Sequence, residues 1–251
     1  MGRVIATTLA PLPEVAPGDD LAALLVAAHD GRAFDPRDVL VVSQKVVSKA
    51  EGRVVALTGV TPSPRAAELC ARLEREDPRL IEVILDETAE LVRAEAGVLI
   101  CRTHHGFVCA NAGVDRSNTG AEDTAVLLPA DPDASARRLR AALPGRPAVI
   151  IADSFGRAWR NGECDVAIGV AGLAPIDDRR GTPDRDGREL QVSAIAIADQ
   201  AAAAADLARG GKAAGRPAVV VSGLGRYRTD ADGPGAAALL RPAGQDLFGA
   251  R

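Results

Sequence analysis

Residues 150–162 read IIADSFGRAWRNG: an apolar run ends on Asp153 and Ser154, and two arginines follow. A second run of this kind, RPAVVVSGL at 216–224, is entered from Arg-Pro as the first one is. Short apolar runs bounded by turn-forming residues are typical of buried strands. The sequence therefore predicts two short buried strands, and the first of them is expected to end at Asp153.

Helix-like and strand-like segments alternate along the rest of the chain. The Ala-rich stretch 193–211 predicts a long helix that ends at Gly210 and Gly211. The runs 97–103 and 107–115 flank His-His-Gly and predict an antiparallel hairpin. Further expectations are a strand over 38–47, helices over 63–77 and 133–143, the latter capped by Asp133, and a long irregular loop over 175–190.

The chain is expected to contain hairpins as well as strand–helix–strand units, which argues against a purely parallel, doubly wound sheet. We therefore expect a mixed α/β (α+β) fold with mixed and antiparallel sheets, hairpins and packed helices. No linker or repeat divides the chain, so residues 1–251 are expected to form one domain, either as one body or as two closely packed lobes.

The bulk composition narrows the classes of partner. The 251 residues carry a formal net charge of −4, which argues against nucleic-acid and anionic-membrane partners. The longest apolar stretch, 194–208, contains Asp199 and Asp206 and is too polar to span a bilayer. No signal peptide is visible, so we expect a cytoplasmic protein with reduced cysteines. Only 2% of residues are aromatic, so Ala, Val, Leu and Ile must build the core.

Four residues that can bind zinc lie close together in CRTHHGFVC, namely Cys101, His104, His105 and Cys109. Structural zinc sites usually need four well-spaced ligands. The His-His-Gly segment also lies between two strand-like runs, as a hairpin turn does. The sequence favours the turn over the metal site.

Two acidic residues follow strand-like runs. Period-two alternation over 107–115 puts Val108, Ala110, Ala112 and Val114 on a core face and Asn111 and Asp115 on the other. Either acid alone is as readily explained as a turn former. Together, Asp115, Asp153 and the Ser154 hydroxyl offer oxygen ligands suited to Mg²⁺ or Mn²⁺, and such ions commonly also bind substrate phosphates.

Basic residues follow the run 38–47. Lys45 and Lys49 are four apart, so on a helix they would share a side and repel each other unless an anion lies between them. The alternative is an ordinary solvated face. The Gly-rich segment 206–215 contains Lys212 but lacks P-loop spacing, and no GxGxxG fingerprint is present. Any nucleotide is therefore expected to bind without a P-loop or a Rossmann fold.

Taken together, these residues resemble the coenzyme F420-0:L-glutamate ligases, the γ-glutamyl ligases of the deazaflavin coenzyme. GRAWRNG followed by DVAIGVAGL is the most specific part of the resemblance. The matching stretches run in order through nearly the whole chain: LPEVAPGDDL (12–21), VVSQKVVSKAEGR (41–53), NAGVDRSN (111–118), ADSFGRAWRNGECDVAIGVAGL (152–173), DGREL (186–190), ADQAAAAADLARGG (198–211) and LLRPAGQDLF (239–248).

The resemblance implies a homodimeric ligase that depends on GTP and on Mn²⁺ or Mg²⁺, with a monovalent cation as a further cofactor. Such enzymes add L-glutamate to the carboxylate of the precursor F420-0 through an acyl phosphate, releasing GDP and phosphate, and can then add γ-linked glutamates. The implied metal ligands are Asp115, Asp153 and Ser154. The implied nucleotide contacts are Leu12, Pro13, Glu14, Val15, Gln44, Lys49, Asn118 and Gly210. To these we add Lys45, Arg157 and Arg160 as contacts to phosphate or to a substrate carboxylate.

The chain departs from the family pattern at four positions. Ser154 and Cys164 stand where threonine is usual, and Arg179 and Asp186 stand where the family favours tyrosine. The changed loop leaves open a ligase of the same mechanism with a different carboxylate acceptor. A nucleotide- or deazaflavin-binding module without catalysis also stays open, as does a plain α/β domain whose acids only form turns.

Two further expectations concern single features. The chain is expected to be the stand-alone form, without the nitroreductase-like second domain that some actinobacterial relatives carry. Trp159 is expected to pack beneath its loop, with stacking on a ligand ring as the second interpretation.

Overall fold

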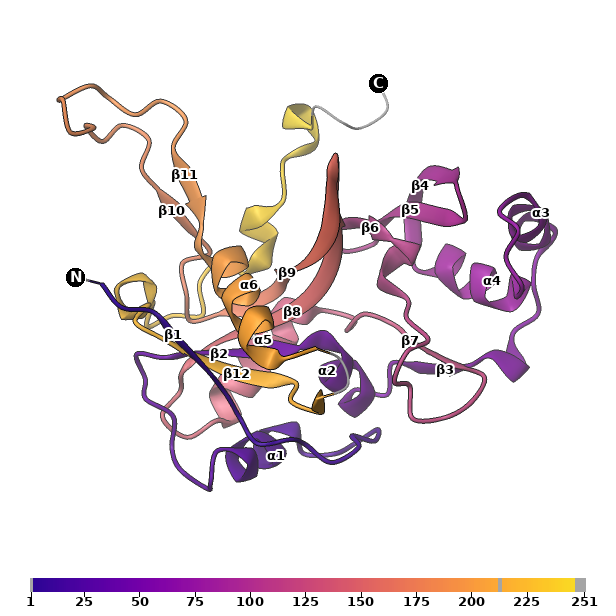
Figure 1. Cartoon of the computed structure of the whole chain (residues 1–251), viewed down its shortest axis with the longest axis horizontal. Coiled ribbons are helices and arrows are strands. Elements are labelled where there is room, and N and C mark those ends of the chain that lie inside the picture. The colour runs from indigo at the N-terminus through magenta and orange to yellow at the C-terminus, as the bar shows by residue number, and fades with distance from the viewer. Residues whose placement is uncertain (1, 212–213, 247–251) are drawn as a thin grey trace.

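The computed structural model describes residues 2–211 and 214–246 (Figure 1). Lys212 and the end of the LLRPAGQDLF stretch lie outside these residues. The helices are α1 (Leu21–Ala28), α2 (Gln44–Ala50), α3 (Pro64–Arg72), α4 (Pro78–Asp86), α5 (Pro132–Ala142) and α6 (Ile197–Arg209). The strands are β1 (Ile5–Thr8), β2 (Val39–Ser43), β3 (Val54–Ala56), β4 (Thr88–Glu95), β5 (Val98–Thr103), β6 (Val108–Ala110), β7 (Thr124–Val126), β8 (Ala148–Arg157), β9 (Arg160–Ala171), β10 (Ile176–Asp178), β11 (Ala194–Ala196) and β12 (Ala218–Ser222).

A five-stranded sheet with the order β1-β12-β2-β8-β9 forms the centre of the larger part of the molecule. Strands β2 and β8 run parallel, and the other neighbouring pairs of this sheet run antiparallel. The central strands are rich in valine and isoleucine, which suit a sheet buried on both faces. The prediction of a mixed sheet with hairpins is confirmed.

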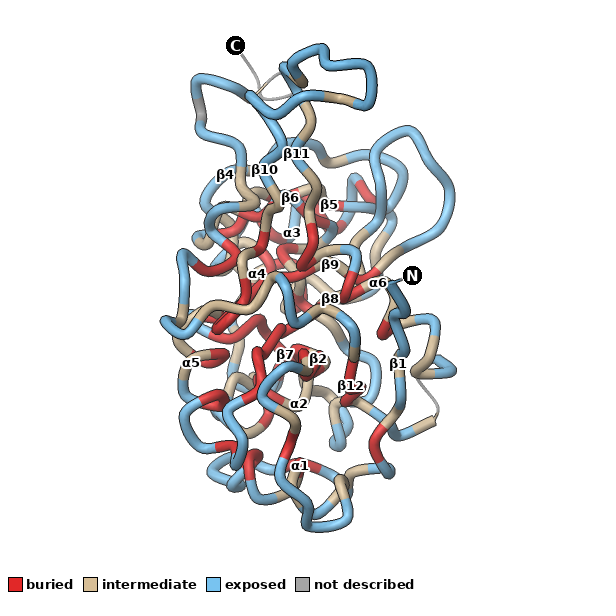
Figure 2. The backbone as a smooth tube through the Cα atoms, turned by 90° about the vertical axis from the view of Figure 1, so that its left-hand side faces the viewer, coloured by how far each residue is buried: buried red, intermediate tan, exposed pale blue. Residues whose placement is uncertain are grey.

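Each face of this sheet packs against a helix because side chains alternate along the strands. Leu40, Val42 and Ile151 face the core that includes α5, and Val41 and Ile150 face the core that includes α6. Helix α6 contributes mainly alanines to its interface, so the helix can approach the sheet closely. Figure 2 shows the buried backbone concentrated in the centre of the molecule.

A smaller part of the molecule has its own core. The sheet β4-β5-β6 packs with α3 and α4, and the first of these helices is shorter than the helix expected over 63–77. Helix α3 ends at Arg72, and α4 begins after Asp77, whose side chain accepts the Arg79 N–H. The division of the chain into one body or two lobes stays a prediction.

The predicted strand 38–47 is wrong in its second half. Strand β2 ends at Ser43, and α2 begins at Gln44. Val46 and Val47 favour a strand by propensity, but in the helix Val47 is buried in the core and Val46 packs against that core. The helix places Lys45 and Lys49 on one side, which is the case in which their charges repel.

The first predicted buried strand does not end at Asp153. Strand β8 continues to Arg157 and pairs with β9, so that Ser154 lies opposite Asp165 in a long hairpin. Polar residues remain in the ladder because β9 supplies their backbone partners. Trp159 lies in the turn of this hairpin with φ of 59° and is 81% exposed, so its expected packing beneath the loop is wrong.

The hairpin over 97–115 is confirmed, but the assignment of its faces is half wrong. Strand β6 is short, with Cys109 buried and Val108 exposed. After Ala110 the backbone takes positive φ at Asn111 and Ala112, which breaks the period-two alternation and turns Ala112 and Val114 into the core.

The His-His-Gly segment is the turn of this hairpin. His104 Nε2 hydrogen-bonds to the carbonyl oxygen of Asp86 at 3.0 Å, and His105 Nε2 to that of Pro129 at 2.9 Å. Cys101 and Cys109 are opposite each other on β5 and β6, and burial raises the pKa of both thiols. The turn interpretation is confirmed.

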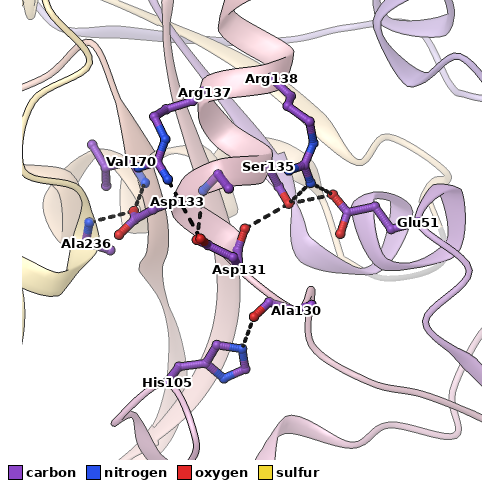
Figure 3. A network of polar contacts seen from close by, with 11 residues as sticks. Glu51, His105, Ala130, Asp131, Asp133, Ser135, Arg137, Arg138, Val170 and Ala236 are labelled. Carbon is purple, nitrogen blue, oxygen red and sulfur yellow. Dashed lines mark hydrogen bonds and ion pairs between the residues drawn. The ribbon is translucent and has the colours of Figure 1, made fainter.

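Figure 3 shows polar contacts that hold α2, α5 and β9 together. Glu51, directly after α2, accepts hydrogen bonds from Ser135 Oγ at 2.5 Å and Arg138 Nη2 at 2.6 Å, both on α5. Asp133, expected to cap α5, instead accepts the backbone N–H of Val170 at 2.8 Å, while Asp131 is the cap. These contacts fix α2, and with it Lys45 and Lys49, relative to the central sheet.

The segment between β10 and β11 forms an exposed arm that projects from the body (Figure 1). The predicted irregular loop 175–190 covers β10 and most of this arm. The helix predicted over 193–211 begins only at Ile197, because Ala194–Ala196 form β11, but α6 ends as predicted, with Gly210 at φ of 79° in the left-handed region that favours glycine. Within the described residues, no helix is both long and apolar enough to cross a membrane.

Candidate active site

A cavity of about 1010 Å³ lies where five separate stretches of the chain meet. Its walls come from the loop 12–15, the first turns of α2, the stretch 109–120, the β8–β9 hairpin, and residues of 206–211 and 215–217. Helix α2 directly follows β2, and β8 and β9 are themselves strands of the central sheet, so the sheet positions two of the walls. Its volume is at the upper end of the range for ligand pockets.

The two lysines of α2 are each paired with a carboxylate. Lys45 Nζ donates to Asp115 Oδ2 at 2.7 Å and to the carbonyl oxygen of Ser117 at 2.6 Å. Lys49, with a side chain only 6% exposed, donates to Glu14. The repulsion between two lysines four residues apart is therefore offset by two acids, which an anionic ligand could replace at the same ammonium groups.

The pKa values of Asp153 and Asp115 are shifted in opposite directions. Burial, together with the charges of Asp165 and Asp115, raises the pKa of Asp153 to about 7, while the Ser154 N–H and Lys45 act to lower it. Burial also acts to raise the pKa of Asp115, but hydrogen bonds from Lys45 and the Ser117 N–H bring that pKa below its ordinary value. One ionised and one readily protonated carboxyl therefore face the same cavity.

This donor set fits a divalent cation. Asp115, Asp153 and Ser154 offer hard oxygen ligands, and the proton bound by Asp153 near pH 7 is one that a cation can replace. Between residues 2–211 and 214–246, no three His, Cys, Asp or Glu side chains gather as a metal site. The protein would therefore supply two carboxylates and a hydroxyl, and water and substrate phosphates would complete the coordination, as is usual for Mg²⁺.

Most of the residues predicted from the sequence lie together in this cavity. Arg157 and Arg160 are not in its wall: both are exposed at the end of the β8–β9 hairpin, where Arg157 Nη2 donates to the carbonyl oxygen of Asn161 at 2.6 Å. Gly210 adjoins the wall as the cap of α6. The predicted residues in the wall are Leu12, Pro13, Glu14, Val15, Gln44, Lys45, Lys49, Asp115, Asn118, Asp153 and Ser154.

Several polar residues of the cavity region were not predicted from the sequence. Glu163, Arg209 and Arg216 are in the wall, and Asp165 is buried directly behind Ser154. Asp165 belongs to the quoted DVAIGVAGL stretch, but its role depends on the hairpin register. That register could be predicted only by extending β8 beyond Asp153.

The raised pKa of Asp153 predicts a pH dependence of stability in the absence of divalent cations. The ordinary pKa of this carboxyl is 3.8. Between that pH and about pH 7, Asp153 holds a proton in the folded protein that it has lost in the unfolded chain. The stability that this proton contributes is complete below the unfolded pKa and is lost as pH rises through about 7. The loss is at most about 4 kcal/mol, because each pKa unit corresponds to about 1.4 kcal/mol.

Thermal unfolding in chelator between pH 5 and pH 8 measures this effect. The melting temperature of the wild type should fall with rising pH relative to that of Asp153→Asn, whose amide carries no proton to lose. Parallel curves for the two proteins would contradict the prediction.

The chain is similar to known proteins along nearly its whole length. Residues 10–223 match the family described as F420-0:Gamma-glutamyl ligase. The chain is 43% identical over 245 residues to the coenzyme F420:L-glutamate ligase of Methanothermobacter thermautotrophicus, covering 94% of this chain and 95% of that protein. It is 41% identical over 256 residues to the protein of the same name from Methanopyrus kandleri, covering 99% and 100%. The Halobacterium salinarum ligase is 45% identical over 215 residues, covering 84% and 83%.

Proposed function

The chain belongs to the F420-0:gamma-glutamyl ligase family and is a ligase that forms C–N bonds, and from this premise we propose that it joins L-glutamate to the carboxylate of F420-0. GTP supplies the driving force, and further γ-linked glutamates can follow. The relatives named above support the acceptor and the amino acid, because their names state this activity.

The observation that carries the nucleotide and metal part of the proposal is the cavity itself. It brings together two lysines, two carboxylates and a serine from distant parts of the sequence. Lys45 and Ser154, the first and last of them, are 109 residues apart. Phosphoryl transfer needs cationic groups to position phosphate oxygens and a divalent cation to neutralise their charge. Lysines that can bind phosphate oxygens and oxygen ligands that can hold a divalent cation lie in one wall. Their combination supports a site for a nucleoside triphosphate.

The reaction proceeds in two displacements. A carboxylate oxygen of the acceptor attacks the γ-phosphorus of GTP, the bond to the β-phosphate oxygen breaks, and GDP leaves. The amine nitrogen of glutamate then attacks the acyl carbon, the C–O bond to phosphate breaks, and the amine gives up a proton. Asp115, Asp153 and Ser154 would hold a Mn²⁺ or Mg²⁺ ion, which when bound supplies neutralisation of phosphate charge.

The lysines of α2 have separate tasks in this proposal. Lys45, between Asp115 and Ser117, lies on the side of the cation ligands and meets the transferred phosphoryl group. Lys49, paired with Glu14, lies on the side of the loop 12–15 and binds the nucleotide, together with Asn118. Arg157 and Arg160 stay predictions for contacts to a substrate carboxylate, since substrate that extends along the hairpin would reach them.

Lys49→Met is expected to raise the KM for GTP on the order of tenfold with a smaller change in kcat. Methionine keeps the buried stem of Lys49 but removes the ammonium that binds phosphate. Steady-state kinetics at varied GTP concentration measures the change. Arg32→Met removes an exposed cation that pairs with Asp30 and serves as the control, with an expected KM equal to that of the wild type. An unchanged KM in Lys49→Met would remove Lys49 from the nucleotide site.

The proposed reaction is tested by incubating the protein with GTP, Mn²⁺, L-glutamate and F420-0. A coenzyme product heavier by one or more glutamyl residues, with one GDP and one phosphate released per glutamate added, supports it. GDP release that requires a different carboxylate would favour the alternative acceptor, which the exposed Arg179 and Asp186 of the arm suggest. GTP binding without GDP release would favour a non-catalytic module.

We also propose a quaternary state and a location for the protein. The resemblance suggests a homodimer in the cytoplasm, and the net charge of −4 disfavours nucleic acid as a partner. Light scattering coupled to size exclusion tests the dimer.

A further inference from the structure

Asp165 forms a buried chain of hydrogen bonds behind the cavity wall. Asp165 is 1% exposed and lies opposite Ser154 in the β8–β9 ladder. Ser154 Oγ donates to Asp165 Oδ1 at 2.6 Å, and Arg209 Nη1 donates to Asp165 Oδ2 at 2.7 Å. The carboxylate is therefore held on both oxygens, by a cavity residue on one side and by the last residue of α6 on the other.

The direction of these hydrogen bonds fixes the Ser154 hydroxyl. A carboxylate paired with a guanidinium can only accept, so the proton of Ser154 points to Asp165. The lone pairs of Oγ are then left for a ligand in the cavity. A hydroxyl in this state suits a cation, whereas a phosphate oxygen would need the Ser154 proton, which is already donated to Asp165.

The pair is not arranged for stability alone. Arg209 has a side chain 12% exposed, and among the described residues its Nε and Nη2 atoms are buried without hydrogen-bond partners. Buried ion pairs often contribute little to stability, and unsatisfied buried donors act against it. An arrangement that leaves two donors unsatisfied beside a cavity calls for a role in binding.

We propose that Asp165 and Arg209 are a positioning pair that holds the Ser154 hydroxyl as an oxygen acceptor for a divalent cation. Arg209 fixes the Asp165 carboxylate, and Asp165 fixes the Ser154 proton. Neither residue touches the reacting groups in this role. The inference rests on the proposed function, which places the cation at Ser154, and it adds the residues that determine the state of that ligand.

Asp165→Asn tests the pair because asparagine reverses the hydrogen bond. The amide oxygen turns to the guanidinium, which forms the stronger charge-assisted bond, and the amide NH₂ then donates to Ser154 Oγ. The Ser154 proton is released toward the cavity. Mn²⁺ binding to the full chain without nucleotide, measured by calorimetry, should weaken about tenfold, as for other residues behind metal ligands.

A double-mutant cycle separates this role from a general effect. Ser154→Ala and Ser154→Ala/Asp165→Asn should bind Mn²⁺ equally weakly, because Asp165 acts through Ser154. Asp199→Asn is the matched control: Asp199 is a half-buried carboxyl on the same helix as Arg209 and accepts the Ala167 N–H, a bond that an amide oxygen also accepts. Its Mn²⁺ affinity should equal that of the wild type.

Three outcomes would count against the proposal. Wild-type affinity in Asp165→Asn, or losses that multiply in the double variant, would overturn the positioning pair and leave the proposed function standing. Absence of Mn²⁺ binding by the wild type would overturn the metal part of the proposed function and this inference with it. If Asp165→Asn does not fold, Asp165→Leu/Arg209→Met removes both charges together, leaves no unpaired buried charge, and should show the same tenfold loss.

Discussion

Asp153→Asn is expected to lower the rate of glutamate ligation on the order of 1,000-fold while the protein stays folded. Asp153 is one of two carboxylates in the cavity wall that are proposed to hold the cation, and an amide cannot replace its charge opposite a cation and three phosphate groups. The fold should tolerate the change because burial already favours the neutral form of Asp153, with a pKa of about 7. Asparagine has the shape and the charge of that neutral form.

The measurement is GDP release and product mass under saturating GTP, Mn²⁺ and glutamate. Asp199→Asn is the control, because burial also raises the pKa of Asp199 but this residue is not in the cavity wall. The control should keep its rate within about threefold of the wild type. A substitution outside the cavity wall that changes the free energy of unfolding little should also change the rate little. A rate for Asp153→Asn within tenfold of the wild type would remove Asp153 from the reaction.

Arg140→Met is expected to lower the free energy of unfolding by about 3 kcal/mol. The Arg140 side chain is 1% exposed and donates from Nη1 to Asp232 at 2.7 Å. Its Nη2 donates to the carbonyl oxygens of Thr229 and Asp230 at 3.3 and 3.2 Å. Methionine fills similar volume but leaves these acceptors without their donor. This loss of stability is at the lower end of the range for a broken buried ion pair. Asp232 is 39% exposed, so its carboxylate can be solvated by water once Arg140 is gone.

Urea unfolding followed by circular dichroism measures this loss. Arg137→Met is the matched control on the same helix, since Arg137 is 41% exposed and pairs loosely with Asp131 at 3.7 Å. Its effect should stay below about 0.5 kcal/mol. Equal stability of the two variants would show that the segment around Asp232 does not depend on Arg140.

The sequence predicted the elements whose signals are local. The Ala-rich stretch and Gly210 predicted α6 and its end, and Val-rich runs predicted β12 and the position of β2, though not where β2 ends. It failed where tertiary contacts override such signals. Val46 and Val47 read as strand but lie in α2, and Asp153 read as the end of a strand that continues because β9 pairs with it.

Most of the residues predicted for the candidate site lie in one cavity wall, although the strand boundaries around them were predicted wrongly. Asp115, Asp153 and Lys45 stood out because charged residues followed apolar runs, and that pattern survives an error of several residues in a boundary. Asp165 and Arg209 were missed because their contacts depend on register and on the position of α6, which no local pattern encodes. Arg157 and Arg160 were placed by proximity in sequence to Asp153, but the extended hairpin carries them past the cavity wall.

The cavity wall also constrains the order in which the chain can fold. The N-terminal strand β1 pairs with β12, and the backbone N–H of Leu12 donates to the carbonyl oxygen of Gly215 at 3.1 Å. The loop 12–15 therefore reaches its place only after residues 215–222 have been synthesised, and contacts this distant in sequence form late and slowly. A nascent chain that lacks them has no complete pocket. Binding of the proposed nucleotide would therefore require that segments from both ends of the chain have joined the central sheet, so that protection by this ligand would report the completed sheet.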